Sequence, residues 1–169
     1  MIIKGKVIKY GDDVNTDVII PGRYLVYDNY EKLASHAMED LDLDFLKKFS
    51  KGDIIVAGKN FGCGSSREQA AICLKYIGVG AIIAKSFSRI FFRNAINQGL
   101  PIIESKQIVE SIKEKDQLSI NFNKGVIENI TINVDLRFKP LPKFLRKIIN
   151  DGGLVPSLKK SKLIDNNAK

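Results

Sequence analysis

Residues 60–68 read Asn-Phe-Gly-Cys-Gly-Ser-Ser-Arg-Glu, and the neighbouring elements are best understood from this stretch. It follows a β-branched run at residues 54–57, which predicts a buried strand, and it precedes a run of helix formers at residues 68–78 that ends in glycine. A strand that turns into a helix in this way points backbone N–H groups and the positive helix end at the space above Ser65 and Ser66. Arg67 adds a planar fork suited to a carboxylate or phosphate. We therefore expect an anion-binding site that contains a hydroxyl nucleophile or base.

The elements around this stretch predict an α/β fold. Buried runs at 81–84 and 100–103, with a helix at 87–97 capped by Ser86, continue a strand–helix alternation that favours a parallel sheet. Further segments have the composition of short elements: strands at 2–9, 117–122, 126–130 and 131–136, and helices at 30–38, 41–49 and 141–150. The three late strands are expected to be antiparallel, because a turn with Asn, Lys and Gly lies among them.

Length and composition indicate one globular domain. The chain has 169 residues, of which 44% are hydrophobic and 27% charged. It contains no apolar run of membrane-spanning length and no signal-peptide pattern, so we expect a cytoplasmic protein without a membrane partner. Its two cysteines, Cys63 and Cys73, are too few for a disulfide framework or for a four-thiolate cluster made from this chain alone.

The net charge of +8 is concentrated in the last fifth of the chain. Residues 137–169 contain nine Lys or Arg and two Asp. Such a segment could contact nucleic acid, attract an anionic substrate or bind an acidic partner. We favour a solvated basic end, because aromatic residues are not interleaved with the cations as a base-stacking surface requires.

Several polar residues allow two interpretations. Asp17 lies in an acid-rich turn, where it either satisfies local backbone donors or orients an arginine of the site. His36 is the single histidine, and a structural role is favoured because no second metal ligand lies at a useful spacing. Arg89 and Arg93 lie one helical turn apart, and solvated side chains are favoured over ligand contacts.

The glycine-rich stretch does not fit the common nucleotide or hydrolase motifs. A P-loop requires Gly-Lys-Ser/Thr, but Gly64 is followed by Ser65. The dinucleotide fingerprint requires a third glycine where Arg67 stands, and a nucleophile elbow centred on Ser66 requires glycine where Glu68 stands. These comparisons make kinase and serine-hydrolase functions weak hypotheses.

Three segments together resemble a known family. They are Gly-Cys-Gly-Ser-Ser-Arg-Glu at 62–68, Ala-Lys-Ser-Phe-Ser-Arg-Ile-Phe-Phe-Arg-Asn at 84–94 and Asp-Val-Asn-Thr-Asp at 13–17. In content, order and chain length they resemble the small subunits of 3-isopropylmalate dehydratases, which are separate-chain forms of the swivelling domain of the aconitase superfamily. The resemblance covers about residues 1–155, and it places Ser88 where relatives usually have alanine. We assign residues 1–158 to this domain and 159–169 to a basic C-terminal tail.

The resemblance implies both a fold and a reaction. The fold would be a three-layer β/β/α swivelling domain with a parallel central sheet and a second, antiparallel sheet. The reaction would interconvert 2- and 3-isopropylmalate through isopropylmaleate in leucine biosynthesis, with a small dicarboxylate substrate. The catalytic centre would be shared with a large subunit that carries a 4Fe–4S cluster, in a heterodimer or heterotetramer, while this chain would bind no cofactor or metal.

The resemblance also implies roles for individual residues. Ser65 would remove the carbon-bound proton, and Ser66, Arg67 and the Gly64 loop would bind a substrate carboxylate. Asp17 would belong to the same active centre. An open iron of the partner would act as a Lewis acid on the departing hydroxyl group.

Val26 and Tyr27 bear on the choice of substrate. Homoaconitase-type relatives tend to carry an arginine in this loop, which would pair with an extra carboxylate, whereas an apolar residue suits an isopropyl group. A homoaconitase or citramalate-isomerase small subunit remains the second enzyme hypothesis. A non-catalytic nucleic-acid-binding module that uses the basic C-terminal segment is the hypothesis from another class, and we expect no nucleic-acid partner.

Overall fold

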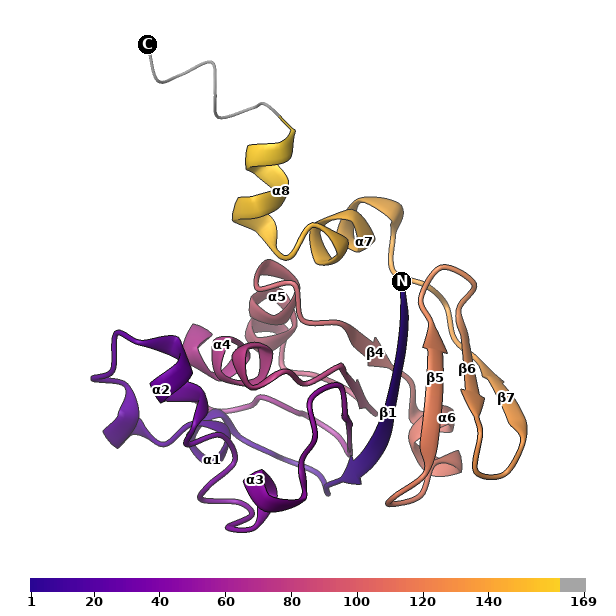
Figure 1. The fold of residues 1–169 in the computed structure, drawn as a ribbon, viewed down its shortest axis with the longest axis horizontal. Helices are drawn as coiled ribbons and strands as arrows, with labels where there is room; N and C mark the ends of the chain where they lie inside the picture. The colour runs from indigo at the N-terminus through magenta and orange to yellow at the C-terminus, as the bar shows by residue number, and fades with distance from the viewer. Residues whose placement is uncertain (162–169) are drawn as a thin grey trace.

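A single seven-stranded sheet forms the centre of the computed structural model, which describes residues 1–161 (Figure 1). The strand order is β4-β3-β2-β1-β5-β6-β7. Neighbouring strands from β4 to β1 in this order are parallel. The remaining pairs, β1–β5, β5–β6 and β6–β7, are antiparallel. The strands are β1 (Ile2–Lys9), β2 (Ile54–Ala57), β3 (Ala81–Ala84), β4 (Ile102–Glu104), β5 (Gln117–Asn121), β6 (Val126–Asn129) and β7 (Val134–Arg137).

Strand β1 joins the parallel and antiparallel halves. Its residues 2–6 pair with β5, and its residues 7–9 pair with β2. The predicted parallel and antiparallel sheets are therefore both present, and they form one curled sheet because they share β1. The mixed α/β fold class is confirmed.

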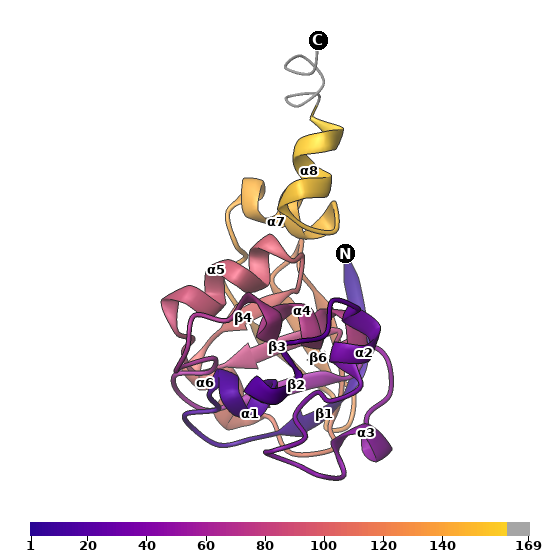
Figure 2. The ribbon, with the colours of Figure 1, turned by 90° about the vertical axis from the view of Figure 1, so that its left-hand side faces the viewer.

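Helices lie around this sheet, and the last two lie beyond α5 (Figures 1 and 2). They are α1 (Thr16–Ile19), α2 (Tyr30–Ala34), α3 (Phe45–Lys48), α4 (Glu68–Ile77), α5 (Arg89–Asn97), α6 (Lys106–Ser111), α7 (Lys143–Asn150) and α8 (Leu154–Lys160), with a 3-10 turn η1 (Gly22–Tyr24). Figure 2 shows α7 and α8 together beyond one end of α5.

Apolar side chains on both faces of the sheet form the core. Every residue of β2 and β3 is buried, which explains why these strands read as continuous apolar runs instead of alternating ones. One buried cluster lies between the sheet and helices α4 and α5, and another lies between the sheet and α6. The two central strands therefore hold the turn after β2 on a rigid base.

The structure corrects several predicted boundaries. Ser88, and not Ser86, is the N-cap of α5. The Phe91 N–H of this helix donates a hydrogen bond to the Ser88 hydroxyl oxygen. The strand expected at 131–136 is β7 at 134–137, because residues 130–133 form the turn from β6. The helix expected at 141–150 begins at Lys143 with Pro142 as its N-cap.

Other helices differ in length or were not predicted. The helical segments expected at 30–38 and 41–49 are short, at 30–34 and 45–48. Helices α1, α6 and α8 were not predicted, and α1 lies in a segment expected to be a turn. The boundary placed after residue 158 falls inside α8, and most of the proposed tail lies outside the described residues, so this division stays a prediction.

No helix within residues 1–161 is long and apolar enough to cross a membrane.

Candidate active site

The loop from Asn60 to Arg67, here called the serine loop, connects β2 to α4 and is held on one side by residues 13–16, where the chain enters α1. The Gly62 N–H donates to the Val14 carbonyl at 2.7 Å. The Thr16 N–H donates to the Cys63 carbonyl at 2.8 Å, and the Thr16 hydroxyl donates to the Ser65 carbonyl at 3.0 Å. Residues 13–17 and 60–68, which are far apart in the sequence, therefore form one structural unit.

Two glycines give the serine loop its shape. Gly62 has φ +75°, and a Cβ atom placed on it would lie 2.2 Å from Phe91 Cγ. Gly64 has φ +90°, a conformation that side-chain-bearing residues rarely adopt. The first glycine allows the loop to approach α5, and the second turns the chain toward the two serines.

Hydrogen bonds to Thr16 also determine where two backbone N–H groups of the serine loop point. A trans peptide group holds its C=O and N–H on opposite sides. Since the Cys63 and Ser65 carbonyls face Thr16, the N–H groups of Gly64 and Ser66 face away from it. Neither N–H donates to any acceptor within the described residues. They are free donors beside the positive end of α4, an arrangement that suits an anion.

Ser65 and Ser66 are exposed at the start of α4. The residue in the N-cap position is Arg67, whose side chain makes no capping hydrogen bond. Across residues 1–161, neither serine hydroxyl is used in a hydrogen bond, so helix capping does not account for them. Both hydroxyl groups are available to a ligand.

Arg67 is held in place by the segment around α1. It forms an ion pair with Asp17 and also approaches the Ile20 carbonyl at 3.5 Å. The guanidinium also lies against Gly22, where a Cβ atom would make an ordinary contact, 3.5 Å from Nη2. Of the two interpretations of Asp17, the structure shows the arginine partner, while Asn15 satisfies the local backbone donors of Asp17 and Val18.

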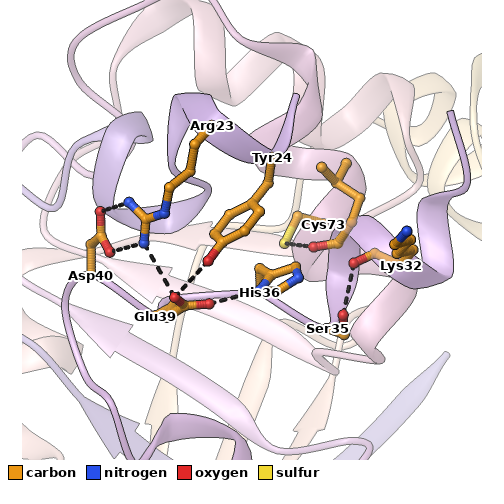
Figure 3. A network of polar contacts seen from close by, with 9 residues as sticks. Arg23, Tyr24, Lys32, Ser35, His36, Glu39, Asp40 and Cys73 are labelled. Atoms are coloured by element: carbon orange, nitrogen blue, oxygen red, sulfur yellow. Dashed lines mark hydrogen bonds and ion pairs between the residues drawn. The ribbon is translucent and has the colours of Figure 1, made fainter. Parts of the chain in front are cut away.

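A polar network fixes the segment that carries Val26 and Tyr27 (Figure 3). The ring of Tyr24 stacks on that of His36 with centroids 3.7 Å apart, and Glu39 accepts hydrogen bonds from the Tyr24 hydroxyl and from Arg23. Hydrogen bonding with His36, and then with Tyr24, holds the pKa of Glu39 below its ordinary value. His36 therefore has the structural role that was favoured.

The side chains near this network differ in whether they already have partners or remain exposed. Arg23 is committed to Asp40, at 2.5 and 2.8 Å, as well as to Glu39. Val26 is 76% exposed, and Tyr27 is half-buried beneath the ammonium of Lys32. Val26 is thus the apolar side chain that this loop offers to its surroundings.

Arg89 and Arg93 are exposed on α5, and the described part of the chain provides no ion-pair partner for either. This placement agrees with the favoured interpretation of solvated side chains.

The cysteines do not form a donor set for a cluster. Cys63 is partly exposed in the serine loop, and burial, followed by the charge of Asp13, raises the pKa of its thiol. Cys73 is buried in α4, and burial raises the pKa of its thiol to about 12. No group of three His, Cys, Asp or Glu side chains suited to a metal occurs among residues 1–161. These residues do not fit a 4Fe–4S cluster.

Two contributions to the site were missed by the sequence analysis. Thr16 positions the serine loop through two hydrogen bonds, although its place in the 13–17 segment was the available signal. The Ser88 hydroxyl donates to the Gly62 carbonyl at 2.6 Å while it caps α5. This bond joins α5 to the serine loop.

Comparison with known proteins identifies the family. Residues 19–107 match the model of the aconitase C-terminal domain. The chain is 52% identical over 160 residues to a 3-isopropylmalate dehydratase small subunit of Clostridium acetobutylicum, covering 95% of this chain and 98% of the relative. It is 53% identical over 161 residues to the protein of the same name from Ruminiclostridium cellulolyticum, covering 95% and 99%.

Solved structures agree with this relationship. The crystal structure of a 3-isopropylmalate dehydratase (leuD) from Methanocaldococcus jannaschii matches with a TM-score of 0.90 and 50% identity, over 100% of both chains. A solution structure of a UPF0107 protein has a TM-score of 0.51 at 20% identity, covers 77% of this chain and 92% of that one, and shows a shared fold alone. The chain belongs to the family of 3-isopropylmalate dehydratase small subunits, within the aconitase superfamily.

Proposed function

We propose that the serine loop is this chain's half of a dehydratase centre that interconverts 2- and 3-isopropylmalate through isopropylmaleate, as a step of leucine biosynthesis. The chain's membership of a hydro-lyase family supports the reaction class. The observation that carries the assignment of residues is that Ser65 is exposed in the turn just before α4, two residues before Arg67, whose guanidinium is held by Asp17.

Arg67 and the loop amides bind a substrate carboxylate in this proposal. The guanidinium offers several N–H donors in one plane, and Asp17 uses part of that fork, which fixes its direction. The N–H groups of Gly64 and Ser66, with the Ser66 hydroxyl, complete the set of donors. The carboxylate is thereby held above Ser65.

Ser65 acts as the base toward the carbon-bound proton. Removal of a proton next to a carboxylate adds negative charge to an already anionic group, so fixed donors at that point lower the barrier by about 3–4 kcal/mol each. The same donors favour the alkoxide form of Ser65, which a free hydroxyl would not reach at neutral pH. Ser65 takes the proton during elimination and returns it when water adds back at the neighbouring carbon.

The rest of the centre is assigned to a large subunit. The serine loop does not line either of two surface cavities of about 820 and 800 Å³ among the described residues. An exposed base requires a covering surface that excludes water from the reaction. We assign that surface to the large subunit, together with a 4Fe–4S cluster that would supply Lewis-acid chemistry at the departing hydroxyl group.

The substrate test uses the assembled enzyme. We expect the chain with its large subunit, prepared anaerobically, to form the unsaturated acid from 2- and 3-isopropylmalate with kcat/KM at least about tenfold above that for citramalate or homocitrate. The absorbance of the unsaturated product provides the measurement, and each subunit alone serves as a control. A preference for homocitrate or citramalate would favour the second enzyme hypothesis, and absence of turnover with all four acids would overturn the proposal.

Val26 is proposed to set this preference. Because Val26 is exposed and apolar, it leaves an additional substrate carboxylate unpaired, which costs about 1–3 kcal/mol. We expect Val26→Arg to lower kcat/KM for isopropylmalate about tenfold or more and to improve turnover of tricarboxylates, with Val26→Leu as the apolar control. Unchanged kcat/KM values for both substrate classes in Val26→Arg would remove this role.

A further inference from the structure

A groove lies between α7 and the turn that joins β5 to β6. Its volume is about 820 Å³. Its lining is Asn123, Lys143, Phe144, Arg146, Lys147, Asn150 and Asp151. We call it the α7 groove.

The charge of the α7 groove is unbalanced. Its one carboxylate, Asp151, is already bound by Lys147 at 2.7 Å, by Lys160 at 3.2 Å and by the Ser157 hydroxyl at 2.8 Å. Lys143 has no carboxylate partner within residues 1–161. The groove therefore keeps a net positive charge after its internal pairs are formed.

Arg146 has unused hydrogen-bonding capacity. Its Nε is buried and has no hydrogen-bond partner among the described residues. Its Nη1 reaches only the Asn123 side-chain oxygen, at 3.4 Å. A buried donor without an acceptor is unfavourable, so a carboxylate that reaches Arg146 Nε on binding would gain a charge-assisted hydrogen bond.

An apolar surface lies beside these cations. Phe144 is 66% exposed. Aromatic side chains that become buried on binding contribute much of the binding energy of many interfaces. The N-cap of α7 is Pro142, which makes no side-chain capping bond, so the positive end of an eight-residue helix adds to the same field. The groove matches a segment that offers carboxylates next to an apolar side chain.

The α7 groove is separated from the serine loop by the length of α5. Gly62 and Ser88 contact the start of α5, whereas Gly153 lies against the Asn97 carbonyl at its end. Figure 2 shows α7 at that far end of α5. Changes in the α7 groove therefore leave the residues assigned to the reaction in place.

We propose that the α7 groove binds an acidic segment of the large subunit, with carboxylates on Arg146 and Lys143 and an apolar side chain on Phe144. The existence of that partner rests on the proposed function and on the relatives' description as small subunits. The surface is a second contact area, remote from the shared catalytic centre.

Two other occupants fit less well. The acidic segment of a second copy, residues 39–44, has its carboxylates paired internally with Arg23, Lys48 and Lys47. Nucleic acid would require stacking surfaces along a basic track, and Phe144 is the single aromatic residue in this lining.

The test compares charge reversal inside and outside the α7 groove. The groove variant is Lys143→Glu with Arg146→Glu, and the control is Lys106→Glu with Lys113→Glu, two exposed lysines around α6. Binding of full-length variants to the wild-type large subunit is measured at low and high salt, and thermal unfolding checks that both variants fold. We expect the groove variant to bind at least tenfold more weakly and with less salt dependence, and the control to stay within about twofold of wild type.

Activity at saturation separates this proposal from the proposed function. With enough groove variant to saturate the large subunit, kcat is expected within about twofold of the wild-type value. A groove variant that binds as tightly as the control would overturn the proposal. It would also be overturned if the groove variant lost self-association of the isolated chain, or retention on RNA, while its affinity for the large subunit stayed unchanged. Loss of affinity in an assembly that turns over none of the expected acids would support the groove and reject the proposed reaction.

Discussion

Gly62 shows how strictly the shape of the serine loop is set at a single residue. Its φ of +75° and its contact with Phe91 both require the absence of a side chain. The strand, the two-glycine turn and the helix could be predicted because they are local features, and the anion site that they favour stays a prediction. The Asp17–Arg67 pair could be predicted only as one of two possibilities, since it joins residues 50 positions apart.

Replacement of Gly62 by alanine is expected to destabilise the fold by at least about 3 kcal/mol, because strained backbone and overpacking against Phe91 add. Gly11 is the control, since nothing lies within 4 Å of a Cβ placed there. Free energies of unfolding from urea titrations measure both changes. Equal, small losses for Gly62→Ala and Gly11→Ala would contradict the account of the loop.

The buried thiol of Cys73 is expected to make the free energy of unfolding fall as the pH rises above 9. Burial raises the pKa of the folded thiol to about 12, so the folded chain keeps a proton that the unfolded chain loses near its ordinary value of 9.0. Stability from this group is present below pH 9 and is lost as pH rises toward 12, by about 1.4 kcal/mol per pH unit. Urea unfolding of wild type and Cys73→Ala under reducing conditions, from pH 8 to pH 11, provides the measurement. The variant is expected to show the shallower decline, and parallel curves would contradict this assignment.

At the scale of elements, the N-cap of α5 is where the sequence-based prediction and the structure differ. The helix and its periodicity could be predicted, but the choice between Ser86 and Ser88 as its cap depends on the tertiary position of the serine loop. Ser88 bonds to the Phe91 N–H and the Gly62 carbonyl, whereas Ser86 accepts from the Asn60 N–H. A cap that serves two segments cannot be assigned from the helix alone.

Ser88→Ala is expected to cost about 1–2 kcal/mol of stability, because it removes an N-cap and leaves the buried Gly62 carbonyl without its donor. Ser86→Ala, whose lost bond goes to the exposed Asn60, should cost about 0.5 kcal/mol or less. Chemical denaturation of the two variants ranks them. A larger loss in Ser86→Ala than in Ser88→Ala would show that the cap has been assigned to the wrong serine.

Boundaries that depend on long-range packing were the least predictable. The strand β7 is shifted to 134–137 because residues 130–133 make the turn that sets its pairing with β6. Helix α8 was not expected after Gly152 and Gly153, which end α7 and let the chain begin a new helix against α5. In both places turn residues give the stopping point of an element but not the start of the next one.

At the scale of the whole molecule, the curled sheet brings two distant loops together. The segment after β1 and the loop after β2 lie at the same edge because β1 and β2 pair in parallel through residues 7–9 and 54–56. The alternation of strands and helices predicts this edge, whereas the sharing of β1 between both halves of the sheet follows from register, which composition does not reveal. The sequence therefore predicts some of the residues that lie at this edge, but not how they are arranged in space.

The central claim is that this chain supplies a serine base and a guanidinium to a centre completed by the large subunit. The most direct measurement is the rate of isopropylmaleate hydration by the assembled enzyme containing wild-type chain, Ser65→Ala or Ser66→Ala, with binding to the large subunit measured in parallel. Ser65→Ala is expected to lower kcat by at least about 10²-fold while subunit affinity stays the same, and Ser66→Ala is expected to act mainly on KM. Equal values of kcat for wild type and Ser65→Ala in fully assembled enzyme would contradict the claim.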